Sequence, residues 1–300
     1  MIKKNIIDKI GNTNLIYLER LSIKYNNNIY MKDESTNPFG SIKDRPALYM
    51  IKKAIEEGKI NKDTLIVEAT SGNTGIGLAG VCMYYGLKLV IVMPSNASIE
   101  RVKIMKAYNA DVRLTNSKLG MQGSIDLALT IMKENPNSYM PSQFENENNY
   151  LSHYETTAAE INNDLNVDII CCGIGTSGTI TGIGKYFKEN KPNVKIIGVE
   201  PFESAVLNNK EKGQHGIDGI GAGFIPSIYN KEYVDEVLDI KTDEAYLGMK
   251  ELMQEEALFV GISTGAAFKG VIKYIEKEKL NNKNVVFISP DSGVKYLSKL

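Results

Sequence analysis

Hydrophobic and polar positions along the chain follow two alternating patterns. Short apolar runs rich in β-branched residues are separated by longer stretches with helical patterns. An apolar run without strict alternation is typical of a strand covered on both faces of a parallel sheet. The runs predict strands at 64–68, 88–93, 111–115, 167–172, 194–200 and 284–289. The stretches between them predict helices at 44–57, 74–85, 98–108, 121–134, 148–164, 179–189, 242–255 and 264–279.

This order of elements predicts an α/β fold with open, mainly parallel sheets. The length of 300 residues suggests about two domains. The polar stretch 143–149 marks a seam between two sheets.

Composition excludes several classes of function. The hydrophobic content of 43% is enough for a large core, and the net charge of −1 gives no basic field for nucleic acid. The N-terminus is too short and polar for a signal peptide, and no apolar run approaches the length of a membrane span. We therefore expect a cytoplasmic globular protein with neither a nucleic-acid nor a membrane partner.

Cysteine and histidine usage argues against a metal site. Cys171 and Cys172 are adjacent, so in a strand their side chains would point to opposite faces. Buried thiols are then expected rather than a disulfide or a pair of metal ligands. The chain has two histidines and no Cys-x-x-Cys, and we expect no bound metal.

Lys43 lies in a restrained turn, Asn37-Pro-Phe-Gly-Ser-Ile-Lys43, directly before a predicted helix. Pro38 fixes its own φ and Gly40 permits a tight bend. A lysine that performs covalent chemistry needs such restraint, but an ordinary surface lysine would satisfy the same segment.

The loop that follows the strand at 167–172 is rich in glycine and hydroxyl groups. Because it ends a strand and opens a helix, its N–H groups and the helix dipole form an anion site. Gly173, Gly175 and Gly178 also satisfy the dinucleotide fingerprint G-x-G-x-x-G, and Glu200 ends the next strand. The hydroxyl groups suit a terminal monophosphate better than a pyrophosphate approached by bare backbone. A nicotinamide enzyme nevertheless stays a rival interpretation.

Two further loops carry candidate chemistry. Glu68-Ala-Thr-Ser-Gly-Asn-Thr74 joins a strand end to a helix start and is well matched to a small carboxylate, although an N-capping turn would explain part of it. Ser289-Pro-Asp-Ser292 follows the last strand, and ligands of open α/β sheets gather at the carboxyl ends of strands.

Taken together, these segments resemble the cysteine synthase and cystathionine β-synthase family of pyridoxal 5′-phosphate (PLP) enzymes, which have the tryptophan-synthase-β-like fold. The matching motifs occur in order along the chain: Asn37-Pro-x-x-Ser-Ile-Lys43-Asp-Arg, Thr70-Ser-Gly-Asn-Thr-Gly, Gln143-Phe, Gly175-Thr-x-Gly-Thr, Gly219-Ile-Gly-Ala-Gly-Phe and Gly261-Ile-Ser-Thr-Gly-Ala. The resemblance implies two sheets flanked by helices, with PLP in the cleft between two domains. The implied smaller, mobile substrate-binding domain is 37–145, and 1–36 with 146–300 form the larger domain that binds the PLP phosphate.

The resemblance also assigns roles to single residues. Lys43 would form the Schiff base with PLP and then act as the general base for the Cα proton. Asn73 would bind the ring hydroxyl oxygen, and Ser292 the pyridine nitrogen. Asp291, beside Ser292, is the alternative for the second contact, and its carboxylate would protonate the ring. The phosphate would be held by Gly175, Thr176, Ser177, Gly178 and Thr179. The substrate would be bound by Thr70, Ser71, Asn73, Thr74, Gln143 and Gly219.

Several positions depart from the family pattern. Ser177 replaces a usual glycine, Thr157-Ala-Ala-Glu160 replaces Thr-Gly-Pro-Glu, and Ala97 stands where methionine is common. Asp218 takes the place of a glutamine in cysteine synthases and a glutamate in cystathionine β-synthases. It is either a solvent-facing loop residue or an acid–base group facing the substrate Cβ.

Asp218 directs the functional hypothesis. Sulfide is largely anionic near neutral pH and needs no base, whereas water does. We therefore favour a β-replacement through an aminoacrylate in which L-cysteine and water give L-serine and hydrogen sulfide. The alternative is a cysteine synthase that joins O-acetylserine and sulfide, and a minor alternative is thiol addition, as in cystathionine or lanthionine formation.

The resemblance further implies a homodimer. Some relatives accept the C-terminal tail of a partner enzyme in the active-site cleft, so a non-catalytic binding protein is another interpretation. The intact Lys43 speaks against that interpretation.

Overall fold

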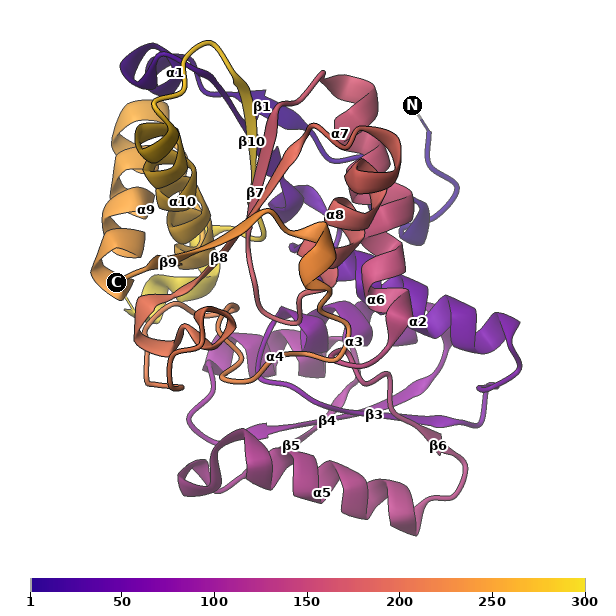
Figure 1. The fold of residues 1–300 in the computed structure, drawn as a ribbon. Helices are drawn as coiled ribbons and strands as arrows, with labels where there is room; N and C mark the ends of the chain where they lie inside the picture. The colour runs from indigo at the N-terminus through magenta and orange to yellow at the C-terminus, as the bar shows by residue number, and fades with distance from the viewer. Residues whose placement is uncertain (1, 300) are drawn as a thin grey trace. The chain divides into compact units, whose positions relative to one another are not determined.

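The computed structural model describes residues 2–299 and divides into two compact units (Figure 1). The first unit comprises the segment up to Ile10 and Lys43–Asn149, and the second comprises Gly11–Ile42 and the chain from Tyr150 onward. The predicted smaller domain, 37–145, has slightly different bounds and lacks the N-terminal segment. The predicted roles of the two domains stay predictions.

The first unit is built on a parallel sheet with the strand order β5-β4-β3-β6. Its strands are β3 (Leu65–Ala69), β4 (Lys88–Pro94), β5 (Asp111–Thr115) and β6 (Ser138–Tyr139). Its helices are α2 (Asp44–Glu56), α3 (Asn73–Tyr85), α4 (Ile99–Ala107) and α5 (Gly120–Glu134). Val67, Val90 and Val92 pack against α5, so the alternate residues Ile66 and Ile91 are buried on the opposite face.

The second unit is built on a mixed sheet with the strand order β1-β2-β10-β7-β8-β9, in which β1 alone runs antiparallel to its neighbour. Its strands are β1 (Leu15–Tyr17), β2 (Asn28–Asp33), β7 (Ile169–Gly173), β8 (Lys195–Pro201), β9 (Glu236–Ile240) and β10 (Asn284–Ser289). Its α-helices are α1 (Glu19–Tyr25), α6 (Glu147–Ser152), α7 (Ala159–Asp164), α8 (Gly178–Asn190), α9 (Thr242–Glu256) and α10 (Ile262–Glu278), of which α6 begins just inside the first unit.

Helices cover both faces of this second sheet (Figure 1). Apolar residues of α1, α9 and α10 pack with Cys171 on one face, and those of α7 and α8 pack with Cys172 on the other. The two adjacent thiols therefore point to opposite faces, as predicted, and both are buried. The α/β class and the two mainly parallel, helix-flanked sheets are confirmed.

The remaining elements are short. A π-helix, η4 (His153–Ala158), separates α6 from α7, so the predicted continuous helix 148–164 is interrupted. The 3₁₀ turns are Ile7–Lys9, Glu34–Thr36, Ser117–Leu119, Phe202–Ser204, Val206–Asn208, Lys231–Tyr233 and Gly293–Lys299. The sequence patterns did not predict α1, β1, β2, β6 or β9.

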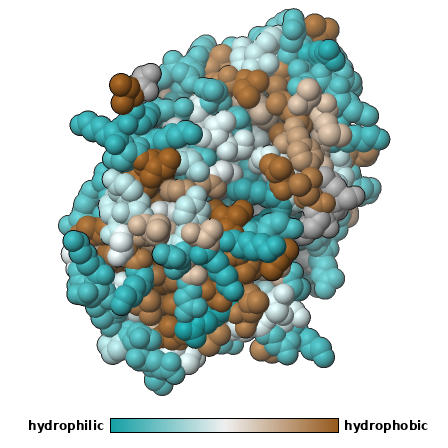
Figure 2. Space-filling view, turned by 180° about the vertical axis from the view of Figure 1, so that it is seen from behind, coloured by the Kyte–Doolittle hydropathy of each residue, from teal (hydrophilic) through white to brown (hydrophobic). Residues whose placement is uncertain are grey.

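Apolar side chains also reach the surface, in patches among polar ones (Figure 2). One set follows α5, where Met121, Ile125 and Leu129 recur at four-residue spacing and are exposed. Among residues 2–299, no helix is long and apolar enough to cross a membrane.

Candidate functional site

Lys43 is the N-cap of α2, with its backbone in the helical region (φ −73°, ψ −11°). The helix begins at Asp44 as predicted, and Pro46 lies in its first turn, where its missing N–H costs no helical hydrogen bond. The Lys43 carbonyl accepts the N–H of Ala47 at 3.0 Å. The backbone of Lys43 is therefore fixed by the helix that it opens.

The start of α2 is also pressed against α3 at Gly77. A Cβ atom built on Gly77 would lie 3.0 Å from the Lys43 carbonyl oxygen and 3.2 Å from the Ala47 Cβ. Only glycine leaves this approach undisturbed. The two helices thereby hold Lys43 in place, which is the restraint that covalent lysine chemistry needs.

The loop from β3 to α3 supplies hydroxyl and amide groups. Thr70 donates its N–H to the Val92 carbonyl at 3.0 Å, and its Oγ1 accepts the Gly72 N–H at 3.3 Å. Arg101 of α4 donates from Nη1 to the Ser71 carbonyl at 3.2 Å. These bonds hold the loop in front of the helix N-terminus, where an anion is stabilised.

Gln143 joins this loop through Thr74, and both side chains are buried. The Thr74 hydroxyl donates to Gln143 Oε1 at 2.6 Å, which leaves the Gln143 Nε2 group as the donating end of the amide. The hydroxyl proton of Thr74 is thus engaged by Gln143. The structure brings Thr70, Ser71, Asn73, Thr74 and Gln143 together within the first unit.

The glycine loop of the second unit runs from the end of β7 to the start of α8. A Cβ atom on Gly175 would lie 2.4 Å from the Gly219 carbonyl oxygen, so no side chain fits there. Ser177 has a positive φ of 67°, a conformation that costs a non-glycine residue about 1–3 kcal/mol. Its Oγ donates to the Thr176 carbonyl at 2.5 Å.

Three hydroxyl groups line this loop and are nearly buried, those of Thr176, Ser177 and Thr179. They surround the N-terminus of a helix of 13 residues, whose dipole and first N–H groups favour an anion. The nearby Thr181 Oγ1 is buried and has no hydrogen-bond partner among the described residues. A small cradle with hydroxyl and N–H donors fits a monophosphate.

His153 stands behind the loop and was not predicted as a site residue. It is fully buried in the π-helix, with Nδ1 2.9 Å from Thr157 Oγ1 and Nε2 3.4 Å from Thr179 Oγ1. π-helical turns occur often at functional sites. The sequence pattern predicts a regular helix through His153, and nothing in that pattern indicates the contact with Thr179.

Asp218 belongs to the segment that covers the glycine loop. Its neighbour Gly219 places a carbonyl against Gly175, and Gly221 donates its N–H to the Ile174 carbonyl at 2.9 Å. Asp218 itself is half-buried. The structure thus brings Asp218 and Gly219 beside the predicted phosphate loop.

Ser292 and Asp291 differ in their surroundings. The Asp291 side chain is buried and accepts the Tyr296 hydroxyl at 2.8 Å. Ser292 is half-buried, and its Oγ is 3.4 Å from the Phe259 carbonyl oxygen. Asp291 is engaged within the unit, so Ser292 is the better candidate for a ligand contact at this position.

Glu68 and Arg101 also went unassigned by sequence reasoning. Burial raises the pKa of Glu68 to about 7, although backbone N–H groups of Ser142 and Gln143 lower it in part. The feature of the sequence that could have singled out Glu68 is a carboxylate near the end of an otherwise apolar strand.

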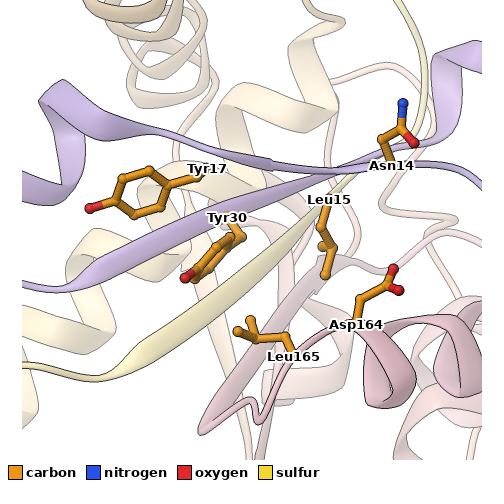
Figure 3. A pocket seen from close by; sticks show the side chains of 6 residues that line it. All are labelled: Asn14, Leu15, Tyr17, Tyr30, Asp164 and Leu165. Atoms are coloured by element: carbon orange, nitrogen blue, oxygen red, sulfur yellow. The ribbon is translucent and has the colours of Figure 1, made fainter.

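A surface hollow of about 340 Å³ lies elsewhere in the second unit (Figure 3). Figure 3 shows Tyr17 and Tyr30 on the neighbouring strands β1 and β2, with Asp164 and Leu165 at the end of α7. No predicted site residue lines it. Among residues 2–299, no three or more His, Cys, Asp or Glu side chains are grouped so that they could hold a metal ion.

Comparisons with known proteins show which family the chain resembles. Residues 6–291 match the family described as "Pyridoxal-phosphate dependent enzyme". Cysteine synthase B of Campylobacter jejuni is 44% identical over 299 residues, which is 99% of this chain and 98% of that protein.

Two solved structures resemble this chain over nearly its whole length. The cysteine synthase of Entamoeba histolytica has a TM-score of 0.96 and 42% identity, covering 99% of this chain and 90% of its own. A hydrogen sulfide-producing enzyme of Fusobacterium nucleatum has a TM-score of 0.94 and 45% identity, covering 99% of this chain and 100% of its own.

Proposed function

The chain belongs to the family of pyridoxal-phosphate dependent enzymes, and from this premise we propose that it replaces the sulfur of L-cysteine with water, giving L-serine and hydrogen sulfide. PLP-dependent β-replacement in sulfur amino-acid metabolism follows from the family and the relatives. The choice of cysteine and water is our proposal, and Asp218 carries it.

The residues of the chain fit the cofactor. The cradle around Gly175 and the hydroxyls of Thr176, Ser177 and Thr179 would hold the phosphate. Lys43, fixed at the start of α2, would hold the cofactor covalently through Nζ. We assign Asn73 to the ring hydroxyl and Ser292 to the pyridine nitrogen. When bound, PLP withdraws electrons from the substrate Cα, which labilises its proton and the group on Cβ.

The side chains of the first unit would bind the substrate and move its proton. Thr70, Ser71 and the Gln143 Nε2 group would donate to the carboxylate, with Thr74 acting through Gln143. Lys43 would take the Cα proton as a general base and return it when the product forms.

Asp218 would take a proton from water as the oxygen bonds to Cβ. Its support is the packing of Gly219 against Gly175, which holds Asp218 beside the predicted phosphate loop. A carboxylate repels the hydrosulfide anion by about 1 kcal/mol at contact in water and by several-fold more in a closed site. Asp218 thus favours water, which needs a base, over sulfide, which needs none.

Purified protein given L-cysteine alone tests the proposal. We expect equal amounts of sulfide and L-serine, and in ¹⁸O-labelled water the serine hydroxyl should carry the label. If serine does not form while O-acetylserine and sulfide are converted rapidly to cysteine, the proposed reaction is wrong.

The Asp218→Asn variant tests the role of the carboxylate. We expect serine formation to fall by about 10²-fold or more, as for loss of a general base, with little change in sulfide release in a single turnover. Glu211→Gln, an exposed carboxylate of the same segment, is the matched control and should behave like the wild type. Equal losses in both steps would remove Asp218 from the addition of water.

Cysteine synthesis is the second candidate, because relatives that are 42–44% identical bear that name. The ratio of the two kcat/KM values, for cysteine alone and for O-acetylserine with sulfide, decides between the candidates. Thiol addition is a third outcome of the same assay when homocysteine or a second cysteine is supplied. We also expect a homodimer, which light scattering will test, and the binding of a partner enzyme's tail stays a prediction.

A further inference from the structure

Glu68 is a buried acid that the proposed reaction does not use. It lies near the end of β3 with 4% of its surface exposed, two residues before Thr70. A buried carboxylate is costly unless hydrogen bonds compensate for its lost hydration. Its partners therefore indicate why the fold retains it.

Those partners are the backbone N–H groups of the segment that carries Gln143. Glu68 Oε2 accepts the Ser142 N–H at 3.0 Å, and the Gln143 N–H also stabilises the carboxylate. Ser142 has a positive φ of 54°, which is strained for a serine and persists only where the surroundings enforce it. Glu68 is the side chain that binds the N–H of this strained residue.

The segment then connects to the loop that follows β3. The Gln143 carbonyl accepts from Asn149 Nδ2 at 2.6 Å, and Gln143 Oε1 accepts the Thr74 hydroxyl at 2.6 Å. Glu68, the Ser142–Gln143 backbone and Thr74 thus form one chain of hydrogen bonds within the first unit.

We propose that Glu68 is a positioning residue that sets the Gln143 amide, and through it Thr74, for binding of the substrate carboxylate. The inference rests on the proposed function of that loop. Glu68 acts through the Ser142–Gln143 backbone, so its loss should weaken substrate binding more than it slows the chemistry.

Tyr139 of β6 is one titratable group that the charge of Glu68 affects. Burial raises the pKa of Tyr139, and the negative charge of Glu68 adds to that rise. The neighbouring strand β4 places the apolar Ile91 opposite Glu68, on the face of the sheet away from α5. The hydrogen-bonded backbone is therefore the main feature that stabilises the ionised carboxylate.

The test compares Glu68→Gln and Glu68→Ala with the wild type. We expect the KM for the amino-acid substrate to rise about tenfold in Glu68→Gln and further in Glu68→Ala, with kcat changed less than threefold. Glu68→Gln has the same shape and decides the test if the alanine variant does not fold. A KM within twofold of the wild type in Glu68→Gln would overturn the proposal.

Glu200 offers a matched control in the second unit. It is also buried in a strand, β8, and its carboxylate accepts the N–H groups of Leu207 and Asn208 at 3.0 and 2.9 Å. Glu200→Gln should leave the substrate KM unchanged. An equal rise in KM in both variants would mean that loss of any such buried acid loosens the fold, and the proposal would be wrong.

A double-mutant cycle tests the route through Gln143. If Glu68 acts through this amide, Glu68→Gln should raise KM much less in a Gln143→Ala background than in the wild type. Full additivity would overturn the proposal. Wild-type protein without β-replacement activity would instead refute the proposed function, so the two failures are distinguishable.

Discussion

At the residue scale, strained backbone occurs at two loops of the candidate site. Ser142 and Ser177 both have positive φ, although serine gains nothing from that conformation. Such strain persists where neighbouring groups hold the chain, and it clusters at ligand sites. Ser142 precedes Gln143, and Ser177 lies in the predicted phosphate loop. The positions of these two serines therefore agree with the roles proposed for their loops.

Gly175→Ala is the residue-scale prediction. The new Cβ would lie 2.4 Å from the Gly219 carbonyl oxygen, so the segment that carries Asp218 must move. We expect PLP affinity to fall at least tenfold, because overpacking typically costs about 1–3 kcal/mol. A fluorescence titration of apoprotein with PLP measures the loss.

Gly72→Ala is its spatial control, since a Cβ there would meet nothing within 4 Å. PLP affinity should be close to that of the wild type in this variant. Unchanged affinity in Gly175→Ala would contradict the close packing of Gly219 on the loop.

Single residues also show where sequence reasoning ends. The motifs around Lys43 and Gly175 were informative because their chemistry depends on local turns. The burial of Lys32 could not be predicted, because most lysines lie on the surface. The structure buries Lys32 completely, with Nζ 2.7 Å from the Thr13 carbonyl and 2.8 Å from Glu160 Oε2. Such distant partners cannot be inferred from spacing.

At the element scale, the predicted helices and strands were those with a strong apolar pattern. β10, for example, spans Asn284–Ser289 as predicted and is buried between β2 and β7. β9 lies at the edge of its sheet and mixes charged with apolar residues without a two-residue alternation, and its Glu236 and Asp239 are paired to lysines. An edge strand of this composition has no distinctive pattern, so it was missed.

Gly77→Ala tests how α3 holds Lys43. The added methyl would press on the Lys43 carbonyl, and a helical backbone cannot yield cheaply. We expect a loss of about 1–3 kcal/mol in unfolding free energy and a lower rate of β-replacement. Urea denaturation and steady-state kinetics measure the two effects.

Met83→Ala is the control on the same helix. Met83 is half exposed, so its truncation should change the free energy of unfolding by less than about 0.5 kcal/mol. If Gly77→Ala is as stable and active as the wild type, the contact with Lys43 does not constrain the site.

At the scale of the whole molecule, each unit has its own core, and each gathers one set of functional groups. The first holds Lys43 and the loop proposed to bind the substrate carboxylate, and the second holds the proposed phosphate loop, Asp218 and Ser292. The order of motifs along the chain could predict both sets. The buried acid Glu68 could not be assigned in the same way, because its role depends on a contact with Ser142, 74 residues away.

The burial of Glu68 predicts how stability depends on pH. Its pKa rises from 4.5 to about 7 in the folded protein, mainly because of burial. Each pKa unit corresponds to about 1.4 kcal/mol, so ionisation of Glu68 should cost the folded state about 3 kcal/mol. The stability that the folded protein keeps while Glu68 is protonated is fully present below pH 4.5, and it is lost as the pH rises through about 7.

Glu68→Gln should therefore flatten the pH dependence between pH 5 and pH 8. Urea denaturation of the wild type and the variant at several pH values gives the difference in unfolding free energy, in which the contributions of the two histidines cancel. We expect the variant to gain on the wild type as the pH rises, because it has no charge to bury. Parallel curves would show that Glu68 ionises in the folded protein as readily as in the unfolded chain. In that case the Ser142–Gln143 backbone would compensate fully for its burial.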